Sequence, residues 1–247
     1  MKVPTISCMG FEIVNTNVDA LVEEAFHHEK IAVNTINPHS YVEQLADPVF
    51  QSALLNSDYL IPDGSGIVLA SKVLTNVKMR KIAGFDLFKS TMEYLEQIKG
   101  KVFLLGATQE VLDRIVARSS KEYPSVEVNT LSPPFKDKFD TDDLKSFVEE
   151  INLIEPDVLF VGLTAPKQEK LIDEIKSDVN VKFSSGIGAV FDFYGETVKR
   201  PSLFWIGLHL EWLVRFVGEP KRLWRRNFVS TPIFLIELIF WKLKIKS

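Results

Sequence analysis

Short apolar runs alternate with helical patterns through the first 200 residues of the chain. Several runs are apolar throughout, which is typical of strands that are covered on both faces. The runs predict strands over Ile31–Ile36, Tyr59–Ile61, Val102–Leu105, Val126–Thr130, Val158–Leu163 and Val181–Ser184. Between them, apolar residues three and four positions apart predict helices over Val18–His28, Pro48–Asn56, Gly66–Leu74, Phe85–Ile98, Gln109–Glu122, Asp142–Leu153 and Lys167–Lys176.

Alternation of strands and helices at this spacing predicts parallel βαβ units in a doubly wound α/β sheet. In such sheets, ligands bind outside the carboxyl ends of the strands. The loops that follow the predicted strands are therefore the places to search for a functional site.

Beyond residue 200 the pattern changes to helices only. An amphipathic, aromatic helix is predicted over Leu203–Val217, and Gly218-Glu-Pro220 ends it. A second helix is predicted over Lys221–Val229, and Thr231-Pro232 begins the apolar run Ile233–Trp241. A membrane-spanning helix needs about 20 apolar residues, so we expect this shorter run to lie on a membrane and not to cross it. The chain is thus predicted to consist of an α/β core, residues 1–200, and a helical appendage, residues 201–247.

The net charge of −4 hides an asymmetry between these two parts. From Lys199 onward, ten Lys and Arg residues oppose three Glu residues, so this tail carries about +7 and the rest of the chain about −11. An acidic body with a basic, aromatic tail indicates that the tail meets an anionic surface. Nucleic acid and anionic lipid both have that charge, and the apolar content of the tail favours lipid.

The single cysteine, Cys8, excludes a disulfide framework within the chain and favours a reducing compartment. The segment Met1–Gly10 lacks the basic start and the apolar run of a secretory signal peptide. We therefore expect a cytoplasmic protein that associates peripherally with a membrane.

Glycine-containing loops follow several of the predicted strands, and they are the first candidates for a binding site. Backbone N–H groups at a helix N-terminus carry partial positive charge and could hold a diphosphate. The alternative is that these glycines only make tight turns, and the chain has neither GxGxxG nor GxxxxGK[ST]. The candidate nucleotide-binding residues are Gly106, Gly162, Lys167, Gly186 and Gly188.

Polar side chains at two other strand ends are candidates for chemistry. Asp63 could act as a general base toward an acceptor hydroxyl, or it could be a helix N-cap. Thr35 and Asn37 lie two positions apart, so they point the same way if the strand continues. Both could hydrogen-bond sugar hydroxyls; the alternative is an Asn-Pro turn.

No metal site is predicted, because the four histidines have no ligand spacing and Asp140-Thr-Asp142 is better explained as a helix cap. The appendage offers arginines instead. Arg215, Arg222 and Arg225 lie among tryptophans, and arginine suits bidentate phosphate binding. A solvated basic face is the alternative, but tryptophans also suit a membrane interface.

Taken together, the motifs resemble those of the WecG/TagA/CpsF glycosyltransferases over nearly the whole chain. The segments that carry the resemblance are Thr35-Ile-Asn-Pro38, Ala46-Asp-Pro48, Pro62-Asp-Gly64 with Gly66, Ala83-Gly-Phe-Asp86, Leu105-Gly106, Pro156-Asp157, Phe160-Val-Gly-Leu163, Ala165-Pro-Lys-Gln-Glu169, Gly186-Ile-Gly-Ala-Val-Phe-Asp192, Leu210-Glu-Trp-Leu213 and Glu219-Pro-Lys-Arg-Leu-Trp-Arg225.

The resemblance implies a Rossmann-like α/β core with an all-helical C-terminal appendage. It implies inverting transfer of a sugar from UDP to an undecaprenyl-diphosphate-linked saccharide at the inner face of the plasma membrane, in cell-surface polysaccharide synthesis and with no obligatory metal or cofactor. The donor sugar would be N-acetylmannosamine, its uronic acid or glucose. No nucleic-acid partner is expected, and a homo-oligomer stays open.

Roles carried over to matching positions make Asp63 the general base and Thr35, Asn37 and Gln168 substrate-pocket residues. The same resemblance brings the appendage arginines Arg215, Arg222 and Arg225 toward the diphosphates. Two rival functions use the same features: a UDP-sugar-binding regulator without catalysis, and a peripheral membrane scaffold. The fold by itself does not decide among the three, because such sheets carry many functions.

Overall fold

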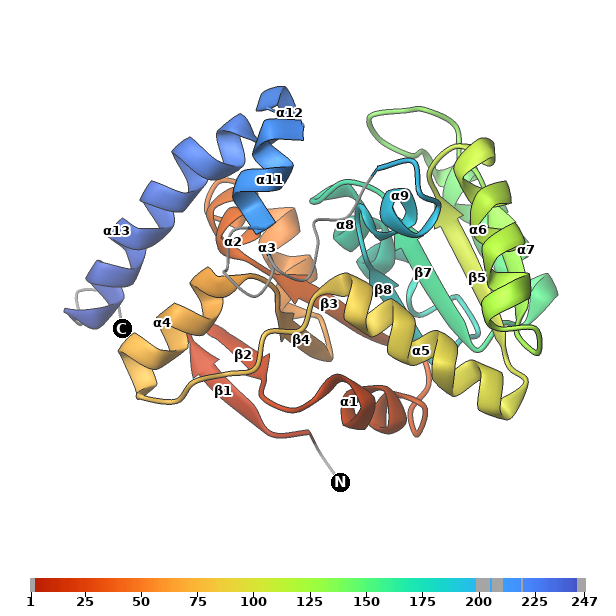
Figure 1. Ribbon diagram of the computed structural model, residues 1–247, viewed down its shortest axis with the longest axis horizontal. Helices are drawn as coiled ribbons and strands as arrows, with labels where there is room; N and C mark the ends of the chain where they lie inside the picture. The colour runs from red at the N-terminus through yellow and green to blue at the C-terminus, as the bar shows by residue number, and fades with distance from the viewer. Residues whose placement is uncertain (1–2, 199–204, 206–210, 219, 244–247) are drawn as a thin grey trace.

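A single eight-stranded sheet lies at the centre of the computed structural model, which describes residues 3–198, 205, 211–218 and 220–243 (Figure 1). The order across the sheet is β1-β2-β4-β3-β8-β7-β5-β6, and the pairs are parallel except for the β1–β2 hairpin. The strands are β1 (Thr5–Cys8), β2 (Phe11–Val14), β3 (Ile31–Ile36), β4 (Tyr59–Pro62), β5 (Lys101–Gly106), β6 (Glu127–Leu131), β7 (Val158–Gly162) and β8 (Phe183–Gly186).

Helices cover both faces of this sheet, which gives three layers. Helices α1, α5, α6 and α9 pack on one face, and α2, α3, α4, α7 and α8 pack on the other. The mostly parallel sheet between helices, together with the helical C-terminal region, confirms the predicted α/β class. The helices of the core are α1 (Val18–Ala25), α2 (Pro38–Gln44), α3 (Pro48–Leu55), α4 (Ser65–Thr75), α5 (Gly84–Ile98), α6 (Gln109–Glu122), α7 (Thr141–Ile154), α8 (Lys167–Ile175) and α9 (Val190–Tyr194).

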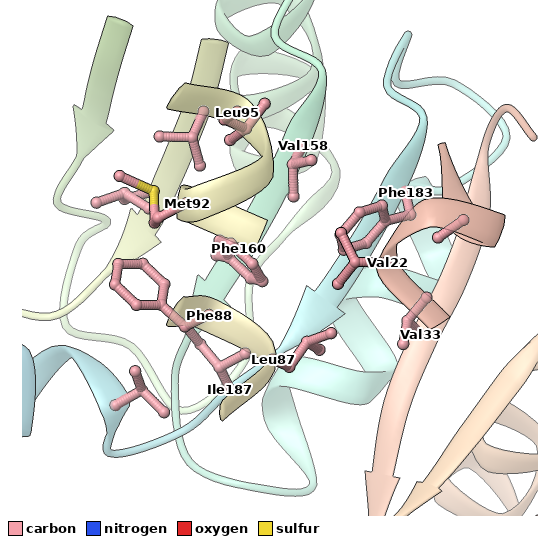
Figure 2. Packing of buried hydrophobic residues seen from close by; sticks show 14 of the residues in the cluster. Val22, Val33, Leu87, Phe88, Met92, Leu95, Val158, Phe160, Phe183 and Ile187 are labelled. Atoms are coloured by element: carbon pink, nitrogen blue, oxygen red, sulfur yellow. The ribbon is translucent and has the colours of Figure 1, made fainter. Parts of the chain in front are cut away.

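The largest cluster of buried side chains lies between α5 and the sheet (Figure 2). Phe88, Met92 and Leu95 follow one face of α5 at helical spacing, and none of them is more than 1% exposed. The ring of Phe88 packs against that of Phe160 on β7, with 5.4 Å between centroids. Each such side chain stabilises the fold by roughly 1.5–3 kcal/mol through burial. This packing fixes the strand ends that carry the candidate site.

The order in which the strands follow each other across the sheet changes direction at β3, which is hydrogen-bonded to β4 on one side and to β8 on the other. The chain continues from β3 to β4, whereas β7, β5 and β6 lie beyond β8. The loop after β3 leads to α2 on one face of the sheet, whereas the loop after β8 leads to α9 on the other face. Such a switch point leaves a crevice in an open α/β sheet.

The C-terminal region is helical, as expected, and its described elements are α11 (Glu211–Gly218), α12 (Pro220–Arg225), a π-helical turn η1 (Arg226–Ser230) and α13 (Thr231–Lys242). Helix α11 ends at Gly218 and α12 begins at Pro220, and Glu219 of the predicted break lies outside the described residues. In the first predicted tail helix, residues 203–204 and 206–210 lie outside the described residues. Helix α13 lies beside α4 and the β1–β2 hairpin (Figure 1).

Helix α13 divides its apolar side chains between the core and the surface. Phe234 and Leu238 are 1% and 6% exposed and belong to the cluster around the β1–β2 hairpin. The Trp241 indole N–H donates a 3.0 Å hydrogen bond to the Tyr41 hydroxyl on α2. The opposite face carries exposed apolar side chains at i, i+3, i+4 and i+7, namely Ile236, Ile239, Phe240 and Leu243.

The structure adds elements that the hydrophobic pattern did not predict. Strands β1 and β2 form a hairpin whose turn residues, Met9 and Gly10, both have positive φ. Helices α2 and α9 have seven and five residues, too few to show a clear period. The last strand is shifted from the predicted Val181–Ser184 to Phe183–Gly186, because those residues pair with β7 and β3. Val181 instead packs beside α8 in the core.

Candidate active site

A cleft of about 860 Å³ opens at the carboxyl ends of the parallel strands. Its walls come from the segments that follow β3, β4, β5, β7 and β8, from the loop 132–137 and from the C-terminal tail. The residues that the sequence singled out and that line this cleft are Thr35, Asn37, Asp63, Gly162, Lys167, Gln168 and Gly188.

Asp63 follows β4 directly and is partly buried at the cleft. Its backbone N–H donates to Ile36 O at 2.9 Å, which extends the pairing of β4 with β3 by one residue. The N-cap of α4 is Gly64, with a φ of +90° that favours glycine, and it has no side chain to cap the helix. Asp63 therefore does not occupy the cap position that was the alternative to a catalytic role.

Thr35 and Asn37 both line the cleft. Asn37 also begins α2, because its Oδ1 accepts hydrogen bonds from His39 N and Ser40 N, each at 3.0 Å. Ser40 Oγ completes the capping box by accepting from Asn37 N at 2.8 Å. The Asn-Pro turn and the cleft position thus occur together, and the cap holds the Asn37 side chain in one orientation.

The candidate glycines divide between the cleft and the layer behind it. Gly162 and Gly188 line the cleft, whereas Gly106 and Gly186 do not. A Cβ on Gly106 would lie 2.5 Å from Gly162 O, and one on Gly162 would lie 2.1 Å from the Phe191 ring. These two glycines permit close approach of β5, β7 and α9 and thereby shape the cleft.

The loop after β8 is held by acceptors on three sides. Gly186 N–H donates to Asn34 Oδ1 at 3.3 Å, Ile187 N–H to Val161 O at 3.0 Å, and Gly188 N–H to Gln168 Oε1 at 2.9 Å. These N–H groups are therefore engaged within the protein. Any contact of this loop with a nucleotide uses other atoms.

Lys167 lies at the start of α8 and lines the cleft. Its Nζ lies 3.8 Å from the centroid of the Phe139 ring and donates to Lys136 O. Burial lowers the pKa of the Lys167 ammonium, while Asp137 and Asp143 act in the opposite direction. Lys167 thus ties the loop 132–137 to α8 at one wall of the cleft.

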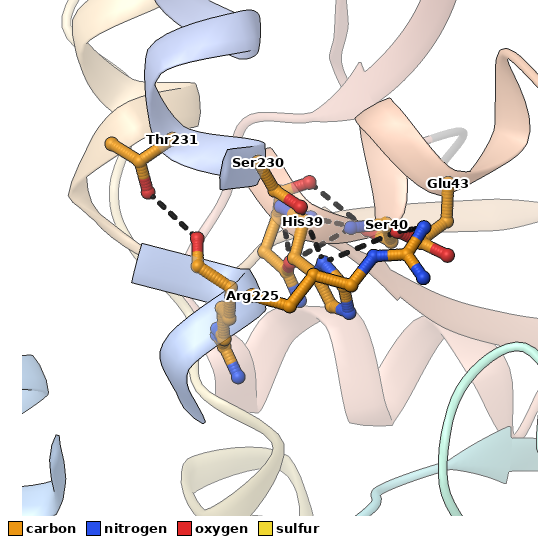
Figure 3. Close-up of polar contacts among 8 residues, drawn as sticks. His39, Ser40, Glu43, Arg225, Ser230 and Thr231 are labelled. Carbon is orange, nitrogen blue, oxygen red and sulfur yellow. Dashed lines mark hydrogen bonds and ion pairs between the residues drawn. The ribbon is translucent and has the colours of Figure 1, made fainter. Parts of the chain in front are cut away.

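The tail contributes two residues to the cleft that were not among the predicted site residues. Leu223 and Arg226 line it. Arg225 instead pairs with Glu43 on α2, with 3.1 Å between Nη2 and Oε1 (Figure 3). The backbone positions of Arg215 and Arg222 are on α11 and α12, and their side chains lie outside the described part of the structure.

A second contact beside this ion pair joins the tail to α2. His39 Nδ1 lies 2.8 Å from the hydroxyl of Ser230, which is fully buried (Figure 3). Burial lowers the pKa of the His39 imidazole; Glu43 raises it, and the nearby Arg226 and Arg225 lower it further. A neutral His39 therefore lines the cleft where the tail meets the core.

Residue spacing had pointed to neither His39 nor Glu169, and the family resemblance had favoured Arg225 over its neighbour Arg226. Arg226 is adjacent to Arg225, and only the π-helical turn that begins there decides which of the two faces the cleft. Glu169 is 1% exposed behind Gln168, and a glutamate within an amphipathic helix gives no sign of such burial. The helix itself was predicted; its rotation against the sheet was not.

Asp140 of Asp140-Thr-Asp142 is the N-cap of α7, as predicted. Asp140 Oδ1 accepts from Asp143 N at 3.0 Å, and Lys136 Nζ bonds both carboxylates. Among the described residues, no group of three or more His, Cys, Asp or Glu side chains could hold a metal ion. Within the same part of the chain, every helix is too short or too polar for a membrane crossing.

Comparison with known proteins identifies the family. The family model "Glycosyl transferase WecG/TagA/CpsF family" matches residues 6–247. A relative from Bacillus spizizenii, 31% identical over 205 residues, covers 83% of this chain and 77% of its own length. It is an N-acetylglucosaminyldiphosphoundecaprenol N-acetyl-beta-D-mannosaminyltransferase.

Two further relatives have the same name. The Bacillus subtilis protein is 30% identical over 231 residues, which are 92% of this chain and 88% of that one. The Staphylococcus aureus protein is 28% identical over 248 residues, or 98% of this chain and 95% of its own. With the family match over residues 6–247, these relatives show that the chain belongs to the WecG/TagA/CpsF family of glycosyltransferases.

Proposed function

We propose that this protein transfers N-acetylmannosamine from UDP to an undecaprenyl-diphosphate-linked N-acetylglucosamine acceptor. The names of the relatives favour this sugar over its uronic acid and over glucose, which the family resemblance also allows. The observation that carries the proposal is the position of Asp63, a carboxylate at the end of β4 in a cleft that the tail helps to line. The core, residues 1–200, would bind the donor.

In the proposed reaction, the Asp63 carboxylate takes the proton of the acceptor hydroxyl as its oxygen attacks the anomeric carbon. The bond from that carbon to the UDP oxygen breaks on the opposite face, so the anomeric configuration inverts. Thr35 and Asn37 lie at the end of β3, the strand that pairs with β4 before Asp63, and would hydrogen-bond sugar hydroxyls. Their orientation is held by β3 and by the cap of α2.

Charge that develops on the leaving UDP needs donors that are already oriented in the cleft. Arg226 supplies one cation at the cleft, and Arg215 and Arg222 of the same tail would supply others. The N-terminus of α6 reaches the cleft at Thr108 and Gln109, with no side chain capping it. Partial positive charge there favours a phosphate. The mechanism therefore proceeds without a metal ion.

We further propose that the protein works at an anionic membrane surface, on the cytoplasmic side. The tail from Lys199 carries about +7, and α13 exposes Ile236, Ile239, Phe240 and Leu243 on one side. A helix with one face docked and the other apolar and exposed suits an interfacial position. The lipid-linked acceptor would then be presented where the tail meets the cleft.

A donor screen tests this function. The protein would be incubated with UDP-N-acetylmannosamine, UDP-glucose or UDP-N-acetylmannosaminuronic acid and a synthetic prenyl-diphosphate-linked N-acetylglucosamine. Mass spectrometry should detect one added N-acetylmannosamine with the first donor, with a β linkage by NMR. UDP binding without any product would favour the regulator, and vesicle binding without UDP binding would favour the scaffold.

A further inference from the structure

Glu169 is a buried carboxyl group that the proposed reaction does not use. It lies in the first turn of α8, is 1% exposed, and directly follows Gln168, which is 4% exposed. Gln168 Nε2 donates a 2.8 Å hydrogen bond to Glu169 Oε1, and Glu169 Oε2 is buried with no hydrogen-bond partner in the structure. Burial of a carboxyl group costs free energy unless hydrogen bonds compensate for the lost water, and here only Oε1 has a hydrogen-bond partner.

The oxygen and the nitrogen of the Gln168 side-chain amide form hydrogen bonds with different partners. Its Oε1 accepts from the Gly188 N–H at 2.9 Å, while its Nε2 faces Glu169. The amide also lies directly over Gly186, where a Cβ would be 2.9 Å from Gln168 Cδ. Gly188 has a φ of +56°, so this hydrogen bond supports a loop conformation that is uncommon for other residues.

A side-chain amide can in principle rotate by half a turn, which exchanges its oxygen and its nitrogen. In that rotated form the NH₂ group of Gln168 would face the N–H of Gly188, and two donors would oppose each other. An acceptor beside the NH₂ group prevents this rotation. Glu169 Oε1 is that acceptor, and it is the only partner that the described residues give to Gln168 Nε2.

We propose that Glu169 is a positioning residue, whose carboxyl fixes the amide of Gln168 and thereby holds the loop Gly186–Gly188 in the form that shapes the cleft. It acts through Gln168, whose Nε2 donates to Glu169 Oε1 at 2.8 Å. Burial raises the pKa of the Glu169 carboxyl to about 7, and the hydrogen bond from Gln168 acts in the opposite direction. The part of this proposal that concerns donor binding rests on the proposed function of the cleft.

Hydrogen exchange of the free protein tests the proposal without any activity assay. In Glu169→Leu, we expect the peptide that covers Gly186–Gly188 to exchange about tenfold faster or more, because the Gln168 amide loses its buried partner. Glu169→Gln should stay near wild type, since its own amide can present an oxygen to Gln168. Glu174→Leu, an exposed position on the same helix, is the matched control and should leave this peptide unchanged.

A double-mutant cycle separates positioning from a general packing role. Gln168→Leu alone should speed exchange of the loop as much as Glu169→Leu does, and the double variant should add nothing further. Additive effects, an unchanged loop in Gln168→Leu, or a Glu169→Gln variant as disturbed as Glu169→Leu would each overturn the proposal. If Glu169→Leu does not fold, Gln168→Leu and Glu169→Gln still decide the question.

UDP titration by calorimetry then tests whether the conformation of the loop Gly186–Gly188 affects UDP binding in the cleft. The Kd for UDP should rise severalfold in Glu169→Leu and stay near wild type in Glu169→Gln, because the carboxyl or amide oxygen restores the loop. If the variants show the expected exchange pattern but the wild-type protein does not bind UDP, the positioning role is supported and the proposed function is contradicted. An unchanged Kd with a faster loop would overturn the link to donor binding.

Discussion

Arg225 on α12 and Glu43 on α2 form an ion pair, with 3.1 Å between Nη2 and Oε1 (Figure 3). The Glu43 side chain is 23% exposed, whereas that of Arg225 stays 69% exposed. The pair fastens the tail to the helix that Asn37 caps, so the tail is docked beside a predicted substrate residue. The guanidinium of Arg225 therefore contacts Glu43, whereas Arg226 lines the cleft.

This difference between adjacent arginines leads to a prediction on a soluble, short-chain acceptor. Arg226→Ala should lower kcat/KM about tenfold or more, since a charged hydrogen bond contributes about 1.5–3 kcal/mol. Arg225→Ala should have a smaller effect, because its partner is Glu43. The triple change of Arg215, Arg222 and Arg225 to Ala should lower turnover if the family resemblance holds for the first two. Equal kinetics for Arg226→Ala and wild type would remove Arg226 from the site.

Asp63→Asn should abolish turnover while the protein stays folded. Loss of a general base lowers the rate by roughly a hundredfold or more, and the N-cap position of α4 is held by Gly64 and not by Asp63. UDP affinity by calorimetry and melting temperature should stay near wild type. Asp178→Asn, an exposed position beyond the far end of α8, is the control and should keep full activity. A variant with wild-type turnover would contradict the assignment.

The two faces of α13 should respond differently to the same substitution. Phe234→Ala should lower the free energy of unfolding by about 3–5 kcal/mol, because the Phe234 side chain is 1% exposed and its ring packs against that of Tyr41, with 5.5 Å between the ring centroids. The double change Ile236→Ala and Ile239→Ala should leave the melting temperature nearly unchanged, as these side chains are exposed.

Flotation with anionic vesicles then measures the second role of the helix. The Ile236→Ala and Ile239→Ala double variant should bind several times more weakly than wild type, because it loses apolar area at the lipid surface. Higher salt should weaken both proteins further, since the tail is basic. Unchanged vesicle binding in the double variant would move the lipid contact away from α13.

Stability should depend on pH through Glu169. The pKa of Glu169 is about 7 in the folded protein against an ordinary 4.5, so folding favours the protonated carboxyl group. The contribution of Glu169 to the free energy of unfolding is therefore fully present below pH 4.5 and is lost as the pH rises through 7. Glu169→Gln cannot ionise and should gain stability relative to wild type between pH 5 and pH 8. The gain is at most about 3 kcal/mol, from the difference between the two pKa values. Thermal melts at matched ionic strength measure it, and a constant difference would contradict the assignment.

Activity should survive EDTA. The cleft offers Arg226 and the N-terminus of α6 for the leaving diphosphate, and Lys136 binds the carboxylates of Asp140 and Asp143. Product formation with the correct donor should therefore be the same with and without the chelator. A loss of activity that Mg²⁺ or Mn²⁺ restores would show that a metal takes part in the reaction.

Local pattern alone determined most of the parallel core. The run Ile31–Ile36 is a strand with the predicted bounds, and Gln109–Glu122 is a helix with the predicted bounds. Both are long and periodic or apolar throughout, so their own residues specify them. The strand ends that carry Thr35, Asn37 and Asp63 followed from that order, because parallel strands share one carboxyl edge.

The tertiary structure decided what depends on how helices turn against the sheet. Arg225 and Arg226 are neighbours with the same chemistry, and only the docking of the tail on α2 gives one of them to Glu43 and the other to the cleft. The apolar run of α13 predicts a helix but does not say that Phe234 completes the core. Burial of Glu169 likewise arises from the packing of α8 on β8, since a carboxyl group becomes buried only through contacts distant in sequence.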